Sequence, residues 1–217
     1  SLEIIKKAFT NDYFSYDGKY HSYDHVCLTP KPLQSPFPPM RVAATTSETF
    51  PVLGKMEMPI FVGLRGLALA DVEEQVTSYT YSMNQVGENV PNVHLRVPVH
   101  VAHSTQEAMR NSEQSFMKQF RRLGSQLGSS VNKETADSVN ERSDRSQRLS
   151  EIRWEDIQGE KVAVGDPETV TKQLKKMKKS LNLSGFALEF NAGEIIPPDK
   201  VKESLTLFCK EVMPELR

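Results

Sequence analysis

Hydroxyl side chains crowd one short turn of the chain, the stretch AATTSET at 43–49, which carries Thr45, Thr46, Ser47 and Thr49. A short apolar segment typical of a buried strand ends here, and a segment with helical spacing begins. Thr45 and Glu48 fit the S/T-x-x-E capping box, in which a hydroxyl and a carboxylate satisfy free backbone N–H groups. The same position also suits an anion, because a helix N-terminus presents unpaired N–H groups and a partial positive charge. The residues alone leave both interpretations open, a helix cap and a phosphate site.

The turn itself contains no lysine or arginine that would neutralise a phosphate. The positive charge must therefore come from another part of the chain. Arg65, just beyond the next expected strand, is a candidate, and a solvated surface arginine is the alternative interpretation.

Histidines form the second group of residues with chemical potential. His94, His100 and His103 lie in or just after one expected strand, but only His94 and His100 share a face, because side chains alternate along a strand. No acid or cysteine stands near enough to complete a metal site, so we predict none. His103 ends the strand and is a candidate for the mouth of a barrel.

Glu189 lies within the last strong strand pattern. A carboxylate in a buried strand costs free energy unless it is paired, which favours an interior ion pair over a place near the substrate. Cys27 and Cys209 are far apart and have no metal-ligand spacing, so we expect buried or incidental free thiols in a reducing compartment.

Composition excludes several classes of protein. The 217 residues are 38% apolar and 25% charged, which is enough to build a core. The net charge of -1, spread along the chain, argues against an electrostatic nucleic-acid binder. No apolar run approaches the roughly 18–20 residues that span a bilayer, and no signal peptide opens the sequence. We therefore predict a cytoplasmic protein with neither a nucleic-acid nor a membrane partner.

Strand and helix patterns alternate along the chain. Strands are expected near 40–46, 58–64, 93–102 and 185–191, with a short one near 161–165. Helices are expected at 1–14, 49–56, 67–87, 105–127, 166–181 and 197–216. A proline-rich connector at 15–40, with a turn at Asp17-Gly18, is expected to run extended over a surface. The polar segment 128–147 has no convincing period and is predicted to be a mobile loop or insertion that orders as a lid.

This alternation predicts an α/β fold with a parallel sheet. A parallel sheet is covered on both faces or closed into a barrel, and four βα units are half of an eight-unit barrel. We therefore predict one domain over 1–217 with the fold of a partial (β/α)8 TIM barrel. A doubly wound sheet is the second choice.

Several motifs in this order carry a family resemblance. They are Gly18-Lys19-Tyr20, LTPKPLQSPFPPMRVAATTSET, MPIF, VPVHVAHSTQEA, VGDPETVTKQL, GFALEFNAGEIIP and SLTLFCKEVMPELR. Together they resemble the bacterial-luciferase-like, flavin-dependent monooxygenase family, over nearly the whole chain except about 110–150. Mapped onto the family, the chain looks like strands five to eight of the barrel.

The resemblance implies an enzyme that uses reduced FMN and O2 to oxygenate a small organic substrate, with F420 as the alternative cofactor. A reductase would supply the reduced flavin. In that family pattern Thr46 and Thr49 would bind the FMN phosphate, Thr45 would contribute through its backbone, and Ala43 and Ala44 would lie beneath the flavin.

The family's catalytic histidine belongs to the first half of the barrel, so we assign no catalytic residue here. Independent activity would then require a homo-oligomer or pairing with an N-terminal half. The alternative is a non-catalytic, truncated half-barrel that acts only as a flavin-binding or assembly module.

Overall fold

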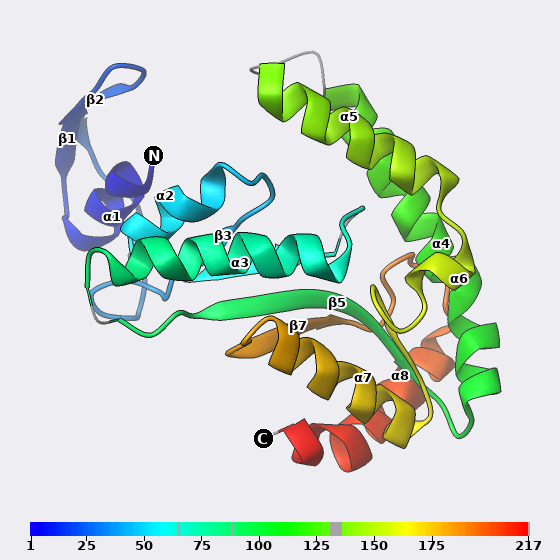
Figure 1. The fold of residues 1–217 in the computed structure, drawn as a ribbon. Helices are drawn as coiled ribbons and strands as arrows, with labels where there is room; N and C mark the ends of the chain where they lie inside the picture. Colours follow the sequence, from blue (N-terminus) through cyan, green and yellow to red (C-terminus); the bar gives the residue numbers. More distant parts are fainter. Residues whose placement is uncertain (65, 88, 131–135, 217) are drawn as a thin grey trace. The chain divides into compact units, whose positions relative to one another are not determined.

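The computed structural model describes residues 1–64, 66–87, 89–130 and 136–216. Where the sequence predicted one domain over 1–217, the chain divides into two compact units, Ser1–Met40 and Arg41–Arg217 (Figure 1). None of the helices in the described part is long and apolar enough to cross a membrane.

The first unit contains one helix and a β-hairpin. Helix α1 (Leu2–Thr10) is followed by β1 (Phe14–Asp17) and β2 (Ser22–Val26), which pair antiparallel. The predicted turn at Asp17-Gly18 is confirmed, since the Gly18 N–H donates to the carbonyl of His21 at 3.0 Å. The prediction of an extended connector over 15–40 was wrong for 15–26, because aromatic residues around an Asp-Gly turn favour a hairpin.

The second unit is built on a parallel sheet, as predicted. Its strands are β3 (Val42–Ala43), β4 (Ile60–Gly63), β5 (Val93–Val101), β6 (Ala163–Gly165) and β7 (Gly185–Glu189). The order is β3-β4-β5-β6, and β7 also pairs with β5. Strand β3 is much shorter than the predicted 40–46, because the chain leaves the sheet after Ala43 to form the hydroxyl-rich turn.

Helices follow the strands. They are α2 (Thr49–Lys55), α3 (Leu69–Asn84), α4 (Thr105–Ser130), α5 (Ala136–Glu151), α6 (Trp154–Ile157), α7 (Pro167–Ser180) and α8 (Pro198–Leu207). The chain continues from α8 through a π-helical turn (Phe208–Val212) and a 3-10 turn (Met213–Leu216). Asp166 caps α7, accepting the N–H of Thr169 at 2.9 Å.

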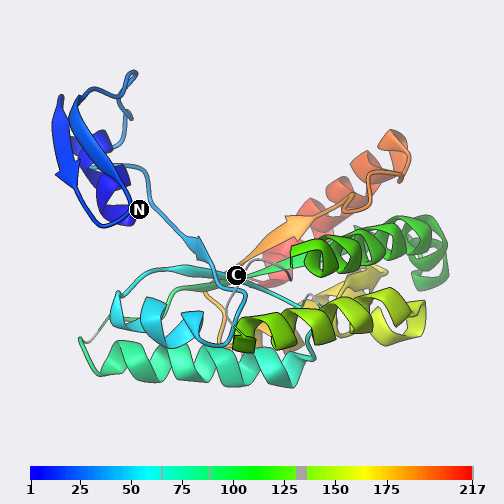
Figure 2. The same ribbon diagram turned by 90° about the horizontal axis from the view of Figure 1, so that it is seen from above.

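The predicted loop at 128–147 is wrong for most of its length. Residues 128–130 end α4, and 136–147 belong to α5; 131–135 lie outside the described residues. Helices α4 and α5 lie side by side in both ribbon views (Figure 2). They approach closely at Gly124, where an added Cβ would meet the Cβ of Leu149 at 3.0 Å, and the Ser146 hydroxyl donates to the Gly124 carbonyl at 2.8 Å. Tertiary contacts therefore stabilise a helix whose composition is almost entirely polar.

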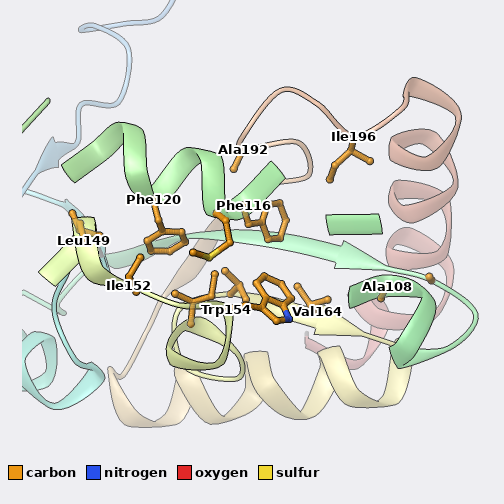
Figure 3. Close-up of a cluster of buried hydrophobic side chains, with 13 residues drawn as sticks. Ala108, Phe116, Phe120, Leu149, Ile152, Trp154, Val164, Ala192 and Ile196 are labelled. Atoms are coloured by element: carbon orange, nitrogen blue, oxygen red, sulfur yellow. The ribbon is translucent and has the colours of Figure 1, made fainter. Parts of the chain in front are cut away.

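A hydrophobic cluster fixes this helical pair to the rest of the unit (Figure 3). Phe116 and Phe120 of α4 pack with Trp154 of α6, Val164 of β6 and Leu149 of α5. All five side chains are less than 9% exposed. The cluster therefore connects α4, α5 and α6 to the sheet as one body.

Candidate functional site

The hydroxyl-rich turn joins the end of β3 to the start of α2. The capping box predicted for Thr45 and Glu48 is wrong: Glu48 is the N-cap residue of α2, and no side-chain cap bond forms. The Thr49 N–H instead donates to the carbonyl of Thr46 at 3.0 Å. The turn is therefore closed by backbone hydrogen bonds, without a side-chain cap.

The hydroxyls in this turn are consequently available for other contacts. Thr46 Oγ1 and Thr49 Oγ1 lie 2.7 Å apart and share a hydrogen bond. The Ser47 hydroxyl donates to Glu141 Oε2 of α5 at 3.2 Å. The turn is therefore in contact with the segment that the sequence predicted to be a loop.

A cavity of about 300 Å³ opens beside this turn, at the carboxyl ends of β3 and β4. Three of the predicted cofactor residues, Ala43, Ala44 and Thr45, line it, whereas Thr46 and Thr49 stand outside its lining. The rest of the wall is mostly apolar, with Phe50, Phe61, Gly63, Leu67 and Ala187. Small, apolar walls at the carboxyl edge of a parallel sheet are typical of sites that take a flat organic molecule.

Two arginines also reach this cavity, and sequence reasoning assigned neither. Arg96 of β5 makes an ion pair with Glu189 of β7, which confirms the pairing predicted for Glu189, but the pair is partly exposed and not interior. Arg145 of α5 is 4% exposed and donates from Nη1 to the carbonyl of Thr45. Glu141 Oε1 lies 4.0 Å from the same guanidinium group. Burial lowers the pKa of Arg145, and the charge of Glu141 partly offsets this effect.

Arg145 supplies positive charge beside a turn that has none of its own. No sequence signal pointed to it, because its burial beside Leu149 on one face of α5 is visible only in the structure. Arg65, the arginine considered from the sequence, lies outside the described residues.

The histidines do not join the cavity. His94 meets the ring of Phe61 edge-on at 5.9 Å, and burial lowers its pKa. His100 is 1% exposed, and burial lowers its pKa to about 4. The His103 side chain is 70% exposed and lies 3.4 Å from Glu203, so the structure places it against α8 and not in the cavity lining.

No group of three or more His, Cys, Asp or Glu residues within 1–64, 66–87, 89–130 and 136–216 is arranged to hold a metal. Cys27 and Cys209 are free thiols, and both are exposed, so the buried alternative is wrong for each.

Comparison with known proteins assigns the chain to a family. The sequence model of the luciferase-like monooxygenase family matches residues 1–182. The chain belongs to this family. Among curated protein sequences no relative matches the chain.

Solved structures share the luciferase-like fold. Monooxygenase RslO1 from Streptomyces bottropensis superimposes with a TM-score of 0.67 at 17% identity, covering 100% of this chain and 60% of that one. The oxygenating constituent of 3,6-diketocamphane monooxygenase from Pseudomonas putida, solved with FMN, gives 0.66 at 16% identity, covering 99% and 61%. The F420-dependent tetrahydromethanopterin reductase from Methanopyrus kandleri gives 0.68 at 17% identity, covering 100% and 62%. At these identities the likeness shows the fold alone. The chain spans about 60% of the length of these structures.

Proposed function

We propose that this chain belongs to a flavin-dependent monooxygenase in which reduced FMN and O2 oxygenate a small organic substrate. The observation that carries the proposal is the 300 Å³ cavity that Ala43, Ala44 and Thr45 line beside the hydroxyl-rich turn. Membership of the luciferase-like family supports it. In this proposal β3, β4, β5 and β7 are strands five to eight of a (β/α)8 barrel, and β6 is an addition at the end of β5.

The residues present fit an isoalloxazine ring and a phosphate. Ala43, Ala44 and Gly63 leave room for a planar ring, and Phe61 offers an aromatic edge. The cavity is at the lower end of the roughly 300–1,000 Å³ range of small-molecule sites. The hydroxyls of Thr46 and Thr49 stand at the polar end of the turn, where they would donate to phosphate oxygens.

Within this proposal the chain positions its ligands and excludes water. Reduced flavin would supply the electrons for oxygen chemistry. The apolar wall around Phe50 and Leu67 would keep water from the reacting region. The Thr45 carbonyl, fixed by Arg145, would hold the turn in one conformation. No residue of this chain is proposed as a proton donor or acceptor.

FMN is our first choice of cofactor, and F420 is the alternative. One solved relative in fold was crystallised with FMN, and another is named for its use of F420. The two differ in chemistry, since deazaflavins pass hydride and do not activate oxygen. A reaction of reduced FMN with O2 whose rate the chain changes, against hydride transfer with F420, therefore separates the two cofactors.

In the experiment the purified chain is titrated with FMN, with and without oxygen. Binding is measured by the quenching of the flavin fluorescence. We expect saturable binding at micromolar FMN and weaker binding, by about tenfold or more, in Ala43→Leu, because the larger side chain fills the cavity. Val52→Leu, which enlarges an exposed residue of α2, is the matched control. Absence of saturable binding to FMN and to F420 would refute a cofactor site in this chain.

One observation favours a second function, that of a flavin-binding or assembly module without activity of its own. Strands β3 and β7 each have one strand partner among the described residues, and every residue of β7 is partly exposed. Unpaired edges favour association with another sheet. Sedimentation of the chain with and without FMN tests this, together with the reaction of reduced FMN and O2 measured with and without the chain. A concentration-dependent dimer that leaves the spontaneous reaction unchanged would favour the module, and a monomer that changes its rate would exclude it.

A further inference from the structure

Two loops line the 300 Å³ cavity, one after β3 and one after β4. The first contributes Thr45 to the lining, and the second contributes Leu67. A long cationic side chain holds each loop by a backbone carbonyl oxygen. Arg145 Nη1 donates to the carbonyl of Thr45, and Lys161 Nζ donates to the carbonyl of Leu67. The proposed function uses Arg145 but gives Lys161 no role.

Both cations belong to one stretch of the chain, which runs from α5 through α6 to the start of β6. Apolar side chains along this stretch are members of the hydrophobic cluster of Figure 3, and each of them is at most 9% exposed. They are Leu149, Ile152, Trp154, Ile157 and Val162. The stretch is therefore firmly packed, and the two loops take their positions from it.

The loop after β4 meets this stretch at two points. Gly66 has a φ of +71°, and a Cβ added there would lie 3.1 Å from the carbonyl oxygen of Arg145, so the loop passes close to α5. Leu67 follows, with its carbonyl bonded to Lys161. At the next residue α3 is about to begin, and the Ala68 N–H donates to Asp71 Oδ2 at 2.9 Å. The bond from Lys161 therefore decides where the Leu67 side chain meets the cavity.

A lysine is a costly residue for this position. Burial lowers the pKa of Lys161, so the fold holds its charged form at the expense of stability. A neutral carbonyl oxygen compensates a buried charge less well than a carboxylate does. An apolar side chain of similar length would avoid this cost. Stability given up in this way is common among residues that serve a site and not the fold.

We propose that Lys161 is a positioning residue for the cavity: its bond to the Leu67 carbonyl fixes the wall after β4 before a ligand binds. The inference rests on the proposed function in that the ligand is the flavin. A wall that is fixed in advance spares the ligand the free energy of ordering it. Without the donor, the cavity would still exist, but binding would have to order this loop.

The test compares three substitutions. Lys161→Met removes the donor and keeps a long side chain, Lys161→Arg keeps a donor, and Lys172→Met, which replaces an exposed lysine of α7, is the matched control. Each chain is titrated with FMN, and its thermal midpoint is recorded. We expect Lys161→Met to bind FMN about threefold to tenfold more weakly, because binding must now order the loop. Its thermal midpoint should equal or exceed that of the native chain.

The other two substitutions complete this comparison. Lys161→Arg should recover most of the affinity for FMN, and Lys172→Met should match the native chain. Native affinity in Lys161→Met would overturn the inference. So would a midpoint that falls together with the affinity, because that result would show a structural role alone.

Hydrogen exchange in the flavin-free chain separates failure of this inference from failure of the proposed function. Mass spectrometry follows the amides of 66–71, which Lys161 holds, and those of 43–49, which Arg145 holds. We expect Lys161→Met to speed exchange in 66–71 and to leave 43–49 unchanged, and Lys161→Arg to restore the native rate. If the native chain binds no flavin, the proposed function fails, but this selective change would still support the role of Lys161 in positioning the loop. Unchanged exchange in 66–71, or equally faster exchange in both segments, would overturn the inference.

Discussion

Helix α2, which begins at the hydroxyl-rich turn, rests on α3 through a glycine. A Cβ added to Gly54 would lie 2.3 Å from the carbonyl oxygen of Tyr79 and 2.9 Å from the Cβ of Ser82. Real Cβ atoms essentially never come closer than 3.0 Å, and the first obstacle is backbone, which cannot rotate away. The substitution Gly54→Ala therefore has to move α2 away from α3.

Two effects of opposite sign decide the outcome. Alanine is favoured over glycine in a helix by at most about 1 kcal/mol, and by less near a helix end. Overpacking against a rigid neighbour costs about 1–3 kcal/mol, and contact with backbone belongs to the upper part of that range. We expect Gly54→Ala to lower the free energy of unfolding by about 1–2 kcal/mol. In a chain of this size that corresponds to a midpoint lower by roughly 2–8 °C.

Urea unfolding followed by circular dichroism measures this loss, with an unchanged denaturant slope showing that the same cooperative unit unfolds. Gly128→Ala in α4 is the matched control. There the nearest atom, at 2.9 Å, is the hydroxyl oxygen of Ser146, at the end of a side chain that can rotate. Helix propensity should prevail at this position and leave stability unchanged or slightly raised. A Gly54→Ala chain as stable as the native one, or a larger loss in Gly128→Ala, would refute the close-packing argument.

Three further predictions concern charged and titratable groups. Asp166→Ala should cost about 1 kcal/mol in urea unfolding, because the cap of α7 is lost. The Thr105 hydroxyl and the cap N–H lower the pKa of Asp166, so its contribution is present above the ordinary carboxyl pKa and is lost as pH falls below it. Burial lowers the pKa of His100 to about 4; its neutral form therefore stabilises the fold fully above pH 6.5, and this is lost toward pH 4. His100→Gln should therefore reduce the pH dependence of stability. Between pH 6.5 and pH 4 its free energy of unfolding should fall by less than that of the native chain, the difference being on the order of 2–3 kcal/mol. Glu189→Gln should lower the free energy of unfolding by less than about 1 kcal/mol, because the ion pair of Glu189 with Arg96 is partly exposed. A double-mutant cycle tests this. The prediction is contradicted if both single variants and the double variant lose equal, large amounts of stability.

Strong periodic patterns made much of the fold predictable. The long strand at 93–101 and the helices at 69–84 and 167–180 carry clear apolar spacing or caps, and the structure places them within a few residues of the prediction. The position of the hydroxyl-rich turn was equally clear, because it lies between a short apolar segment and a helix. Its internal hydrogen bonds were not, since Thr45 and Glu48 match a capping motif that does not form in the structure.

Helix α5 shows why the rest of the site could not be predicted. Its sequence is dominated by charged and hydroxyl residues, so few apolar residues mark the face that it buries. The helix packs against α4, and the closest contact is at Gly124, where the missing side chain leaves space for Leu149. Arg145, one turn before Leu149 on the same helix, is also buried. A residue whose environment is formed by a distant segment leaves little trace in its own neighbourhood of the sequence.

Strand β5 has a consequence for how the chain folds. It pairs with β4, β6 and β7, and the bond between Arg96 and Glu189 joins residues 93 positions apart. Bringing such distant residues together costs chain entropy before the stabilising contacts form. Proteins rich in such contacts therefore fold slowly. We expect the pairing of β5 with β4 to form early in folding. The pairing of β7 with β5 should be the slow step. A substitution in β7 should therefore speed unfolding more than it slows folding, whereas one in the β4–β5 pair should do the reverse.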